Sequence, residues 1–418
     1  MGLSYSTMAI VKLAFAAWFL AWLSRLVYDL IVPSFTKKQK PIPPETSKFI
    51  QDQRRVANFG FLPDKSLENR LIARAIPNER LVEVYGIDNS FTTTSATAYR
   101  RFLSGVKRIL PNSKTENWPR FFEAASTAFG LTLDQLSNTR GSLPLAAFVR
   151  QLVFLTTLYS FFDVNPEDVN LEDVGVATIA INDLWVYSKT DTSPEILQAS
   201  RTQLKGALRR ILPNRSTTDN PLNIIIPAYE TMWRVVLLTY ITAGFRDVDQ
   251  DTADQFRQVV QGVPECFERG SSDNVATMAM NFSKEGLRLY PPTRRIYRDF
   301  DGEQQTADIL QCHRDPAIWR DPERFRPGRF APGEFTADMK RAYLPFSIEP
   351  HKCPAADRFA PHVIVILVVI LAKGLGTLES GAEVRFGDEE LDRDRSAVLP
   401  SGRLDTEEWT LRVRKKNV

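Results

Sequence analysis

The loop "LPFSIEPHKCPAAD", Leu344 to Asp357, decides how the rest of the chain is interpreted. It places Cys353 between prolines, with His351 two residues before it and the apolar run "VIVILVVILA", Val363 to Ala372, behind it. The chain has only three cysteines, and none belongs to a CxxC pair. This distribution argues against a disulfide framework and against a structural zinc site. Taken alone, Cys353 is most simply a small buried hydrophobic residue.

Two further motifs precede this loop along the chain. The first is "KEGLRLYPP", Lys284 to Pro292, in which Glu285 and Arg288 lie three residues apart and therefore share one face of a helix. The second is "HRDPAIWRDPERFRPGRF", His313 to Phe330, whose "PERF" segment supplies Arg324 in a proline-bounded turn. Each is weak evidence alone, because an exposed ion pair on a helix contributes little to stability.

In this order, the ExxR, PPxxxR and PERFxPxRF motifs and the cysteine loop resemble the signature of the cytochrome P450 family, most closely between Leu222 and Gly374. The resemblance implies a mainly α-helical fold with small β-sheets, and haem b as the cofactor. It implies that Cys353 is the thiolate ligand of the haem iron, which pushes electron density onto the iron and favours cleavage of the O–O bond. It also implies that His351 contacts a haem propionate and that Phe346 is the aromatic residue that the family carries in this loop.

The loop departs from the family pattern FxxGxxxCxG at two positions. Glu349 and Ala355 stand where the family carries glycine. The first glycine usually supports an unusual turn, and glutamate tolerates such a turn poorly if its φ is positive. We therefore expect weaker haem binding or a shifted redox potential, with the thiolate ligand retained.

Haem propionates also need cationic partners. Arg294, Arg295 and Arg298 follow the ExxR helix, and we expect one of them, Arg295 or Arg298 in preference, to reach the haem. The WxxxR motif that the family usually carries upstream is absent, and "YRRF", Tyr99 to Phe102, is the nearest match, so Arg100 or Arg101 is the expected substitute.

A second set of charged residues is expected to be structural. The resemblance implies that Glu285, Arg288 and Arg324 form a buried network. Burying two arginines with one carboxylate is costly unless all three satisfy one another, and arginine offers the planar, bidentate geometry for that. Such a network would fix the segment that leads to Cys353 rather than take part in the reaction.

The segment "PAYET", Pro227 to Thr231, stands where the family has [AG]Gx[DE]T in its long central helix. Pro227 predicts a kink there, because proline removes one helical hydrogen bond. Thr231 can donate a hydrogen bond to the carbonyl of Pro227. We expect Glu230 and Thr231 to be the catalytic pair that relays protons to bound dioxygen. An ordinary buried helix with a polar kink is the alternative.

The N-terminal stretch from Met8 to Phe35 is apolar enough to form a membrane helix. The basic "KKQK" of residues 37–40 favours keeping the rest of the chain in the cytoplasm. We therefore expect a single-pass anchor at residues 1–35, a basic, proline-rich hinge at 36–48 and a catalytic domain at 49–418, at the endoplasmic reticulum. An amphipathic helix that packs on the domain or lies on the membrane surface is the alternative.

Periodicity predicts helices over most of the chain, with short strands after residue 383 and a turn at "LPSGR". The apolar run of residues 363–372 is too short to cross a membrane and predicts a buried helix. The predicted helices are Ala98–Leu110, Trp118–Gly130, Ser193–Leu212, Leu222–Gly244, Asp251–Val260, Asn274–Leu289 and Asp357–Gly374.

The leading hypothesis is a membrane-anchored haem-thiolate monooxygenase that inserts one oxygen atom from O2 into a largely apolar small molecule. Its electrons would come from NADPH through a separate cytochrome P450 reductase, because the chain shows no flavin or nicotinamide motif. Lys340, Arg341 and Lys352 would form the basic patch for that reductase. The chain looks similar to fungal enzymes of secondary-metabolite biosynthesis. The nearly balanced 53 basic and 50 acidic residues give no reason to expect a nucleic-acid partner.

Three alternatives remain. The first is an enzyme of the same fold that catalyses a rearrangement or dehydration without oxygen insertion. The second is a degenerate scaffold that has lost haem binding or catalysis. The third is a cysteine hydrolase using Cys353 and His351, but two residues apart in a proline-bounded loop is poor geometry for a nucleophile and its base.

Overall fold

The computed structural model describes residues 42–110, 118–136, 142–214, 219–269 and 273–412. Backbone contacts divide the chain into two units, Met1–Pro44 and Glu45–Val418. The predicted membrane anchor at residues 1–35 lies outside the described residues and stays a prediction.

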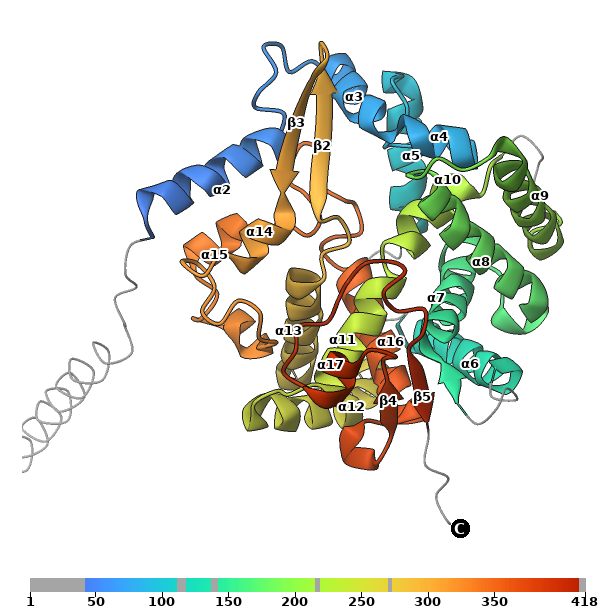
Figure 1. Cartoon of the computed structure of the whole chain (residues 1–418), viewed down its shortest axis with the longest axis vertical. Coiled ribbons are helices and arrows are strands. Elements are labelled where there is room, and N and C mark those ends of the chain that lie inside the picture. Colours follow the sequence, from blue (N-terminus) through green and yellow to red (C-terminus); the bar gives the residue numbers. More distant parts are fainter. Residues whose placement is uncertain (1–41, 111–117, 137–141, 215–218, 270–272, 413–418) are drawn as a thin grey trace, which may run out of the picture. The chain divides into compact units, whose positions relative to one another are not determined.

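The described chain is mainly helical (Figure 1). Its α-helices are α2 (Pro44–Ala57), α3 (Leu67–Ala75), α4 (Glu79–Tyr85), α5 (Ala96–Ile109), α6 (Trp118–Leu136), α7 (Leu145–Phe162), α8 (Leu171–Tyr187), α9 (Pro194–Ile211), α10 (Leu222–Ile225), α11 (Trp233–Phe245), α12 (Gln250–Arg269), α13 (Asp273–Leu289), α14 (Ile309–Arg314), α15 (Ala337–Ala342), α16 (Phe359–Leu375) and α17 (Glu389–Arg393). The shorter turns are η1 (Ile76–Asn78), η3 (Pro166–Asp168), η4 (Ile226–Glu230), η5 (Pro327–Phe330) and η6 (Leu378–Ser380). The strands are β1 (Leu143–Pro144), β2 (Arg295–Phe300), β3 (Glu303–Asp308), β4 (Glu383–Arg385) and β5 (Thr410–Arg412).

A helix is present at each of the seven predicted places, although α6 and α12 extend six and nine residues beyond their predicted ends and the predicted Leu222–Gly244 helix is divided in two. Helix α9 shows why the starts were predictable, because Ser193 caps it and Pro194 occupies its first turn. Helix α2 differs from the prediction. It begins at Pro44, so the last residues of the predicted hinge at 36–48 are helical rather than extended. Proline is compatible with a first helical turn, since its missing N–H has no intrahelical acceptor there.

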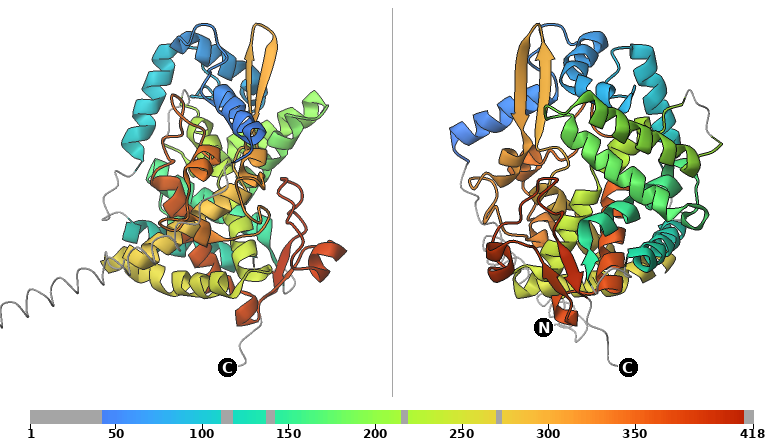
Figure 2. Two further views of the ribbon diagram at one scale, coloured as in Figure 1. Left: turned by 90° about the vertical axis from the view of Figure 1, so that its left-hand side faces the viewer. Right: turned by 45° about the vertical axis from the view of Figure 1, so that its right-hand side comes forward.

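The centre of the molecule consists of helices that are apolar on nearly all sides. Helix α7, the α10–η4–α11 segment and the stretch Phe359–Ser380, which α16 begins, are long and apolar enough to cross a membrane by length and composition alone, and most of each is buried within the structure. Helix α16 contains the apolar run of residues 363–372 and packs against α11 and α13 (Figure 2). It is therefore the buried core helix that the sequence predicts, and it follows the Cys353 loop directly.

The long central helix predicted at Leu222–Gly244 is interrupted. A π-helical turn, η4, separates α10 from α11 and contains Pro227. Proline provides no amide hydrogen for the helical ladder, so a wider turn at this point is the expected consequence. The predicted kink is confirmed.

Two small antiparallel sheets complete the fold. Strands β2 and β3 form a hairpin that packs against α3, and the strands of the other sheet are in the order β1–β5–β4. The hairpin and this C-terminal sheet lie at opposite ends of the described unit (Figures 1 and 2). The alternation of β2 buries Ile296 and Arg298 and exposes Arg295 and Tyr297.

Candidate functional site

Backbone hydrogen bonds within the loop hold the conformation around Cys353. The Cys353 N–H donates to the carbonyl of Phe346 (3.0 Å), and the Ala356 N–H donates to the carbonyl of Cys353 (3.2 Å). Burial raises the pKa of the Cys353 thiol, while a backbone hydrogen bond at Ala355 and the positive charge of Arg74 act in the opposite direction. The geometry therefore presents a shielded sulfur with a cationic neighbour, a setting in which a bound metal ion would favour the thiolate.

The strained residue of this loop is not the one that the sequence comparison predicts. Ser347 adopts a left-handed backbone, with φ of 58°, whereas Glu349 is not among the residues with positive φ. Glu349 therefore does not occupy the kind of turn that demands glycine. Phe346 packs partly buried against the main hydrophobic core and anchors the start of the loop.

His313 ties the loop to the ExxR helix. Its Nε2 accepts a hydrogen bond from the Leu344 N–H (2.8 Å), and its Nδ1 lies 3.0 Å from the carbonyl of Arg288. A nitrogen that accepts carries no proton, so the neutral ring must donate from Nδ1 to this carbonyl. Burial, with the charge of Arg288, lowers the pKa of His313 to about 3, which fixes the neutral form. His313 was not among the predicted site residues.

Glu285 and Arg288 form the buried pair that the sequence predicts. Arg288 Nε and Nη2 donate to the two Glu285 carboxylate oxygens at 2.7 and 2.8 Å, and both side chains are 0% exposed. Arg288 Nη1 donates to the carbonyls of His313 and Pro322, both at 2.7 Å. The pair therefore has its charge neutralised and also connects α13 to the chain that follows α14.

The third member of this network is Arg329, and the prediction of Arg324 is wrong. The Arg329 Nε donates to Glu285 Oε1 (3.1 Å) and the side chain is buried. Arg324 has an exposed side chain and contributes only its backbone carbonyl, which accepts from Arg288 (3.2 Å) and Arg329 (3.1 Å). The segment "PERFRPGRF" contains three arginines, and the η5 turn buries the last of them, Arg329.

A second buried group contains basic side chains and no acidic one among the described residues. Arg74, Arg298 and His351, named here the basic cluster, come from α3, from β2 and from the cysteine loop. His351 Nδ1 lies 3.3 Å from Arg74 Nη1 and 2.7 Å from the hydroxyl of Tyr99. The Arg298 guanidinium stacks over the ring of Phe59 at 4.6 Å. Among the described residues, none of the three cluster members forms an ion pair with a carboxylate.

The basic cluster retains unused hydrogen-bond donors. A guanidinium can only donate, so His351 Nδ1 accepts from Arg74 and the ring proton lies on Nε2. That Nε2 atom is buried without a partner, as is Nε of Arg298. Burial lowers the pKa of Arg74 to about 10, of Arg298 to about 9 and of His351 to about 3, and repulsion by neighbouring arginines adds to the shift for Arg298 and His351. The cluster is costly alone and suited to bind an anion.

Two predicted partners of the haem propionates do not belong to this cluster. Arg295 is exposed on β2 and pairs with Asp308 (3.1 Å), because strand alternation turns it away from the side of Arg298. Arg101 is exposed on α5, where Tyr99 is the residue that turns inward to His351. Arg74 was not predicted. Its sequence signal is a single arginine within the otherwise apolar stretch "LIARAI".

These residues fit a haem. The donor set is one partly buried thiol and three buried basic groups without a carboxylate partner in the described part of the chain, and an N–H of His351 and an N–H of Arg298 are unsatisfied there. A haem carries two propionate carboxylates and an iron that accepts a thiolate, so it complements both features. Cys353 would hold the iron, and Arg74, Arg298 and His351 would hold the carboxylates.

The structure assigns Glu230 a different partner from the one expected of a proton relay. Its carboxylate forms a buried ion pair with Arg403 of the C-terminal segment and accepts from Trp233 Nε1 (3.2 Å). The Thr231 hydroxyl donates to the carbonyl of Pro227 (2.8 Å), as the sequence predicts. Glu230 therefore fastens the central helix to the C-terminal segment, while Thr231 lines a pocket described below.

Comparison with known proteins agrees with these features. The family model described as cytochrome P450 matches residues 301–369, which include Cys353. The chain is 34% identical over 133 residues to a flavonoid-6-hydroxylase from Mentha piperita, covering 28% of this chain and 24% of that protein. It is 24% identical over 321 residues to a lithocholate 6-beta-hydroxylase from Mesocricetus auratus, covering 68% of this chain and 62% of that protein. The chain thus spans less than two thirds of the length of either relative.

The fold comparison extends over more of the chain. A six-coordinated cytochrome P450 from Thermus thermophilus superposes with a TM-score of 0.51 at 16% identity, covering 74% of this chain and 82% of that one. At such low identity this similarity concerns the fold alone. With the motif-bearing match over residues 301–369 and the two relatives, it supports assigning the chain to the cytochrome P450 family.

Proposed function

We propose that this protein is a haem-thiolate monooxygenase that inserts one oxygen atom from O2 into a largely apolar small molecule. The observation that supports it best is the juxtaposition on one loop of the Cys353 thiol and His351, the latter within a basic cluster that lacks any carboxylate partner among the described residues. When bound, haem b would supply the oxygen-binding and redox chemistry.

The chain's own residues have separate roles in this proposal. Cys353 provides the iron ligand, and its pKa falls when a cation binds the sulfur. The basic cluster orients the haem through its carboxylates. The Glu285–Arg288–Arg329 network and His313 fix the segment that leads to Leu344, which would position the Cys353 sulfur to bind the haem iron.

On the oxygen side, Thr231 is the proposed catalytic hydroxyl. Its proton is directed to the Pro227 carbonyl, which leaves the oxygen lone pairs free to accept a hydrogen bond from water or ligand. The predicted role of Glu230 as its relay partner changes, because the Arg403 ion pair and the Trp233 hydrogen bond engage one carboxylate oxygen. We propose that Glu230 positions the kinked helix and that protons reach Thr231 through water.

The remaining parts of the proposal concern partners and location. The electrons come from NADPH through a separate reductase, and the chain is anchored at the endoplasmic reticulum with its catalytic domain in the cytoplasm. Lys340, Arg341 and Lys352 are proposed to contact the reductase. Lys352 already pairs with Asp357 and Arg341 with Asp338 (3.2 Å), so part of this charge is neutralised within the chain.

The natural substrate is proposed to be an apolar compound of secondary metabolism. The names of the two relatives refer to a flavonoid and to lithocholate, two different polycyclic compounds, and do not indicate a single substrate class.

Incubation with NADPH, a cytochrome P450 reductase and oxygen-18 gas tests the proposal. We expect a screened apolar substrate to gain one labelled oxygen atom, only when both NADPH and the reductase are present. Turnover to an unlabelled product without NADPH would instead support the rearrangement or dehydration alternative. A folded protein that binds no haem would support the degenerate scaffold.

A further inference from the structure

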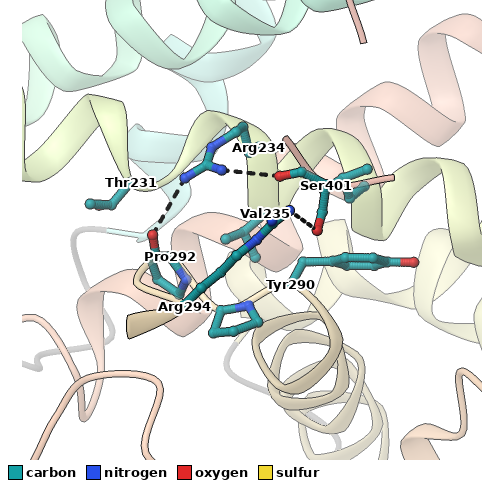
Figure 3. A pocket seen from close by; sticks show the side chains of 9 residues that line it. Thr231, Arg234, Val235, Tyr290, Pro292, Arg294 and Ser401 are labelled. Carbon is teal, nitrogen blue, oxygen red and sulfur yellow. Dashed lines mark hydrogen bonds between the residues drawn. The ribbon is translucent and has the colours of Figure 1, made fainter. Parts of the chain in front are cut away.

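A small pocket lies where three distant segments of the chain meet (Figure 3). Thr231 and Arg234 line it from the central helix, Arg294 from the loop after α13, and Ser401 from the C-terminal segment. The cavity itself measures about 10 Å³. This is close to the minimum volume that holds one water molecule, roughly 10–15 Å³, so it admits the oxygen atoms of a head group and not a whole small molecule. The pocket therefore suits the head group of a ligand whose remainder lies outside it.

The pocket is lined by two guanidiniums that lack a carboxylate partner among the described residues. Arg234 donates to the carbonyls of Ser401 (3.1 Å) and Pro292 (3.4 Å), and its Nε is buried without a partner. Arg294 donates from Nη2 to the Ser401 hydroxyl oxygen. Neither arginine forms an ion pair with an acid in the described part of the chain. The Ser401 hydroxyl accepts from Arg294, so its own proton remains available to an anion.

The charges around the pocket leave a positive excess. Burial lowers the pKa of Arg234 to about 10, Arg403 and Arg294 lower it further, and the carboxylates of Glu230 and Asp405 oppose them. Glu230 is already paired with Arg403. Asp405 accepts a hydrogen bond from the Gly402 N–H (2.6 Å) and keeps its negative charge. The three arginines Arg234, Arg294 and Arg403 therefore face two carboxylates, which leaves an excess of one positive charge.

We propose that the pocket binds a carboxylate of the substrate, held by Arg234 and Arg294 and by the hydroxyl of Ser401. The inference rests on the proposed function, because Thr231 lines the same pocket, and it narrows the substrate class to apolar small acids. Paired guanidiniums match the planar, bidentate shape of a carboxylate. Val235 and Leu238 line the pocket beside them and suit the apolar part next to the head group.

The test is calorimetric binding to the full chain, supplied with haem, using three matched pairs of compounds. The acids are dodecanoate, naphthalene-2-carboxylate and lithocholate, and each is compared with its methyl ester, which keeps the apolar skeleton and removes the charge. We expect at least one acid to bind about tenfold or more tightly than its ester, since hydrogen bonds to charged groups are the stronger ones.

Variants then assign the effect to the pocket. Arg294→Gln should abolish the preference for the acid, and Arg294→Lys should restore part of it by restoring the charge. Arg295→Gln removes the same charge from the next residue, which is exposed and paired with Asp308, and should leave the preference unchanged.

Equal affinity of acid and ester in all three pairs, a preference that survives in Arg294→Gln, or no binding by any acid would each overturn the inference. Calorimetry detects binding with or without haem. A missing thiolate-haem spectrum in the same sample would therefore count against the proposed function and not against the carboxylate pocket.

Discussion

The Glu285–Arg288–Arg329 network and the basic cluster are both buried, but they differ in how many of their polar atoms have a hydrogen-bond partner. In the Glu285–Arg288–Arg329 network, the described hydrogen bonds occupy every nitrogen of both arginines and both carboxylate oxygens. In the basic cluster, three positive or basic side chains face one another without a carboxylate from the described residues, and two nitrogens have no partner.

This difference separates a structural role from a binding role. Burying a charge is tolerated when its partners are present, and costs free energy when they are not. The network is complete within the chain, so its function is to hold the fold. The basic cluster is incomplete within the described chain, so a ligand must supply the missing anions.

The largest expected effect comes from breaking the complete network. Arg288→Leu leaves the Glu285 carboxylate buried beside Arg329 alone, and we expect the free energy of unfolding to fall by about 3–5 kcal/mol, as for other buried pairs that lose one partner. Urea unfolding followed by circular dichroism measures it. Arg324→Ala is the matched control, because that side chain is exposed, and should change stability by less than about 0.5 kcal/mol. A loss in Arg324→Ala as large as in Arg288→Leu would show that the wrong arginine has been placed in the network.

Removing one charge from the basic cluster should leave the stability of the haem-free protein nearly unchanged and weaken haem binding. Arg298→Met keeps the apolar stem over Phe59 and removes the unpaired charge, so haem-free protein should change in stability by no more than about 1 kcal/mol. Haem affinity should fall about 10–100-fold, the amount expected for one lost charge-assisted hydrogen bond. Haem titration and unfolding of the haem-free chain measure the two quantities.

Arg295→Met serves as the control for that experiment, since Arg295 is exposed and paired with Asp308. It should alter neither haem affinity nor stability. An Arg298→Met protein that binds haem normally would remove the basic cluster from the site.

Lowering the pH should reduce the stability of the protein through protonation of His313 in the unfolded state. Its pKa is about 3 in the folded protein and 6.5 as a free side chain, so between these values only the unfolded state takes up the proton. The stabilisation is complete above pH 6.5 and is lost as the pH falls towards 3, by about 2 kcal/mol at pH 5. Unfolding at pH 7 and pH 5 should show this extra loss in the wild type and not in His313→Gln. Equal pH dependence in the two proteins would contradict the buried neutral form.

The smallest effect concerns backbone strain in the cysteine loop. Ser347 has φ of 58°, which costs an L-residue free energy that glycine avoids, so Ser347→Gly should stabilise the protein by up to about 1 kcal/mol. Glu349→Gly, at the family's glycine position, should not stabilise it. The midpoint of thermal unfolding distinguishes the two, and a gain confined to Glu349→Gly would contradict the loop conformation.

The features that depend on residues close together in the sequence were predictable. The seven helices, the break at Pro227 and the Glu285–Arg288 pair follow from periodicity, from a missing amide hydrogen and from i,i+3 spacing. The choice between Arg324 and Arg329 depends on which way a short turn faces, which no local pattern fixes.

The basic cluster was harder to predict because it is assembled from distant segments. Arg74 contacts His351 across 277 residues of sequence, and a single arginine in the short apolar stretch "LIARAI" gives no indication of that partner. The Glu230–Arg403 ion pair was missed for the same reason, because its second residue belongs to the C-terminal segment. The burial of Arg298 rather than Arg295 follows from the alternation of side chains along β2, but predicting it requires the strand boundaries, which the sequence did not fix.

The most direct test of the central claim, that Cys353 and the basic cluster hold a haem, is a difference spectrum. The full chain is expressed with haem supplied, reduced and exposed to carbon monoxide, alongside Cys353→Ala. We predict the red-shifted Soret band of thiolate-ligated haem in the wild type and its absence in Cys353→Ala. A well-folded wild type without that band, or an unchanged band in Cys353→Ala, would contradict the assignment.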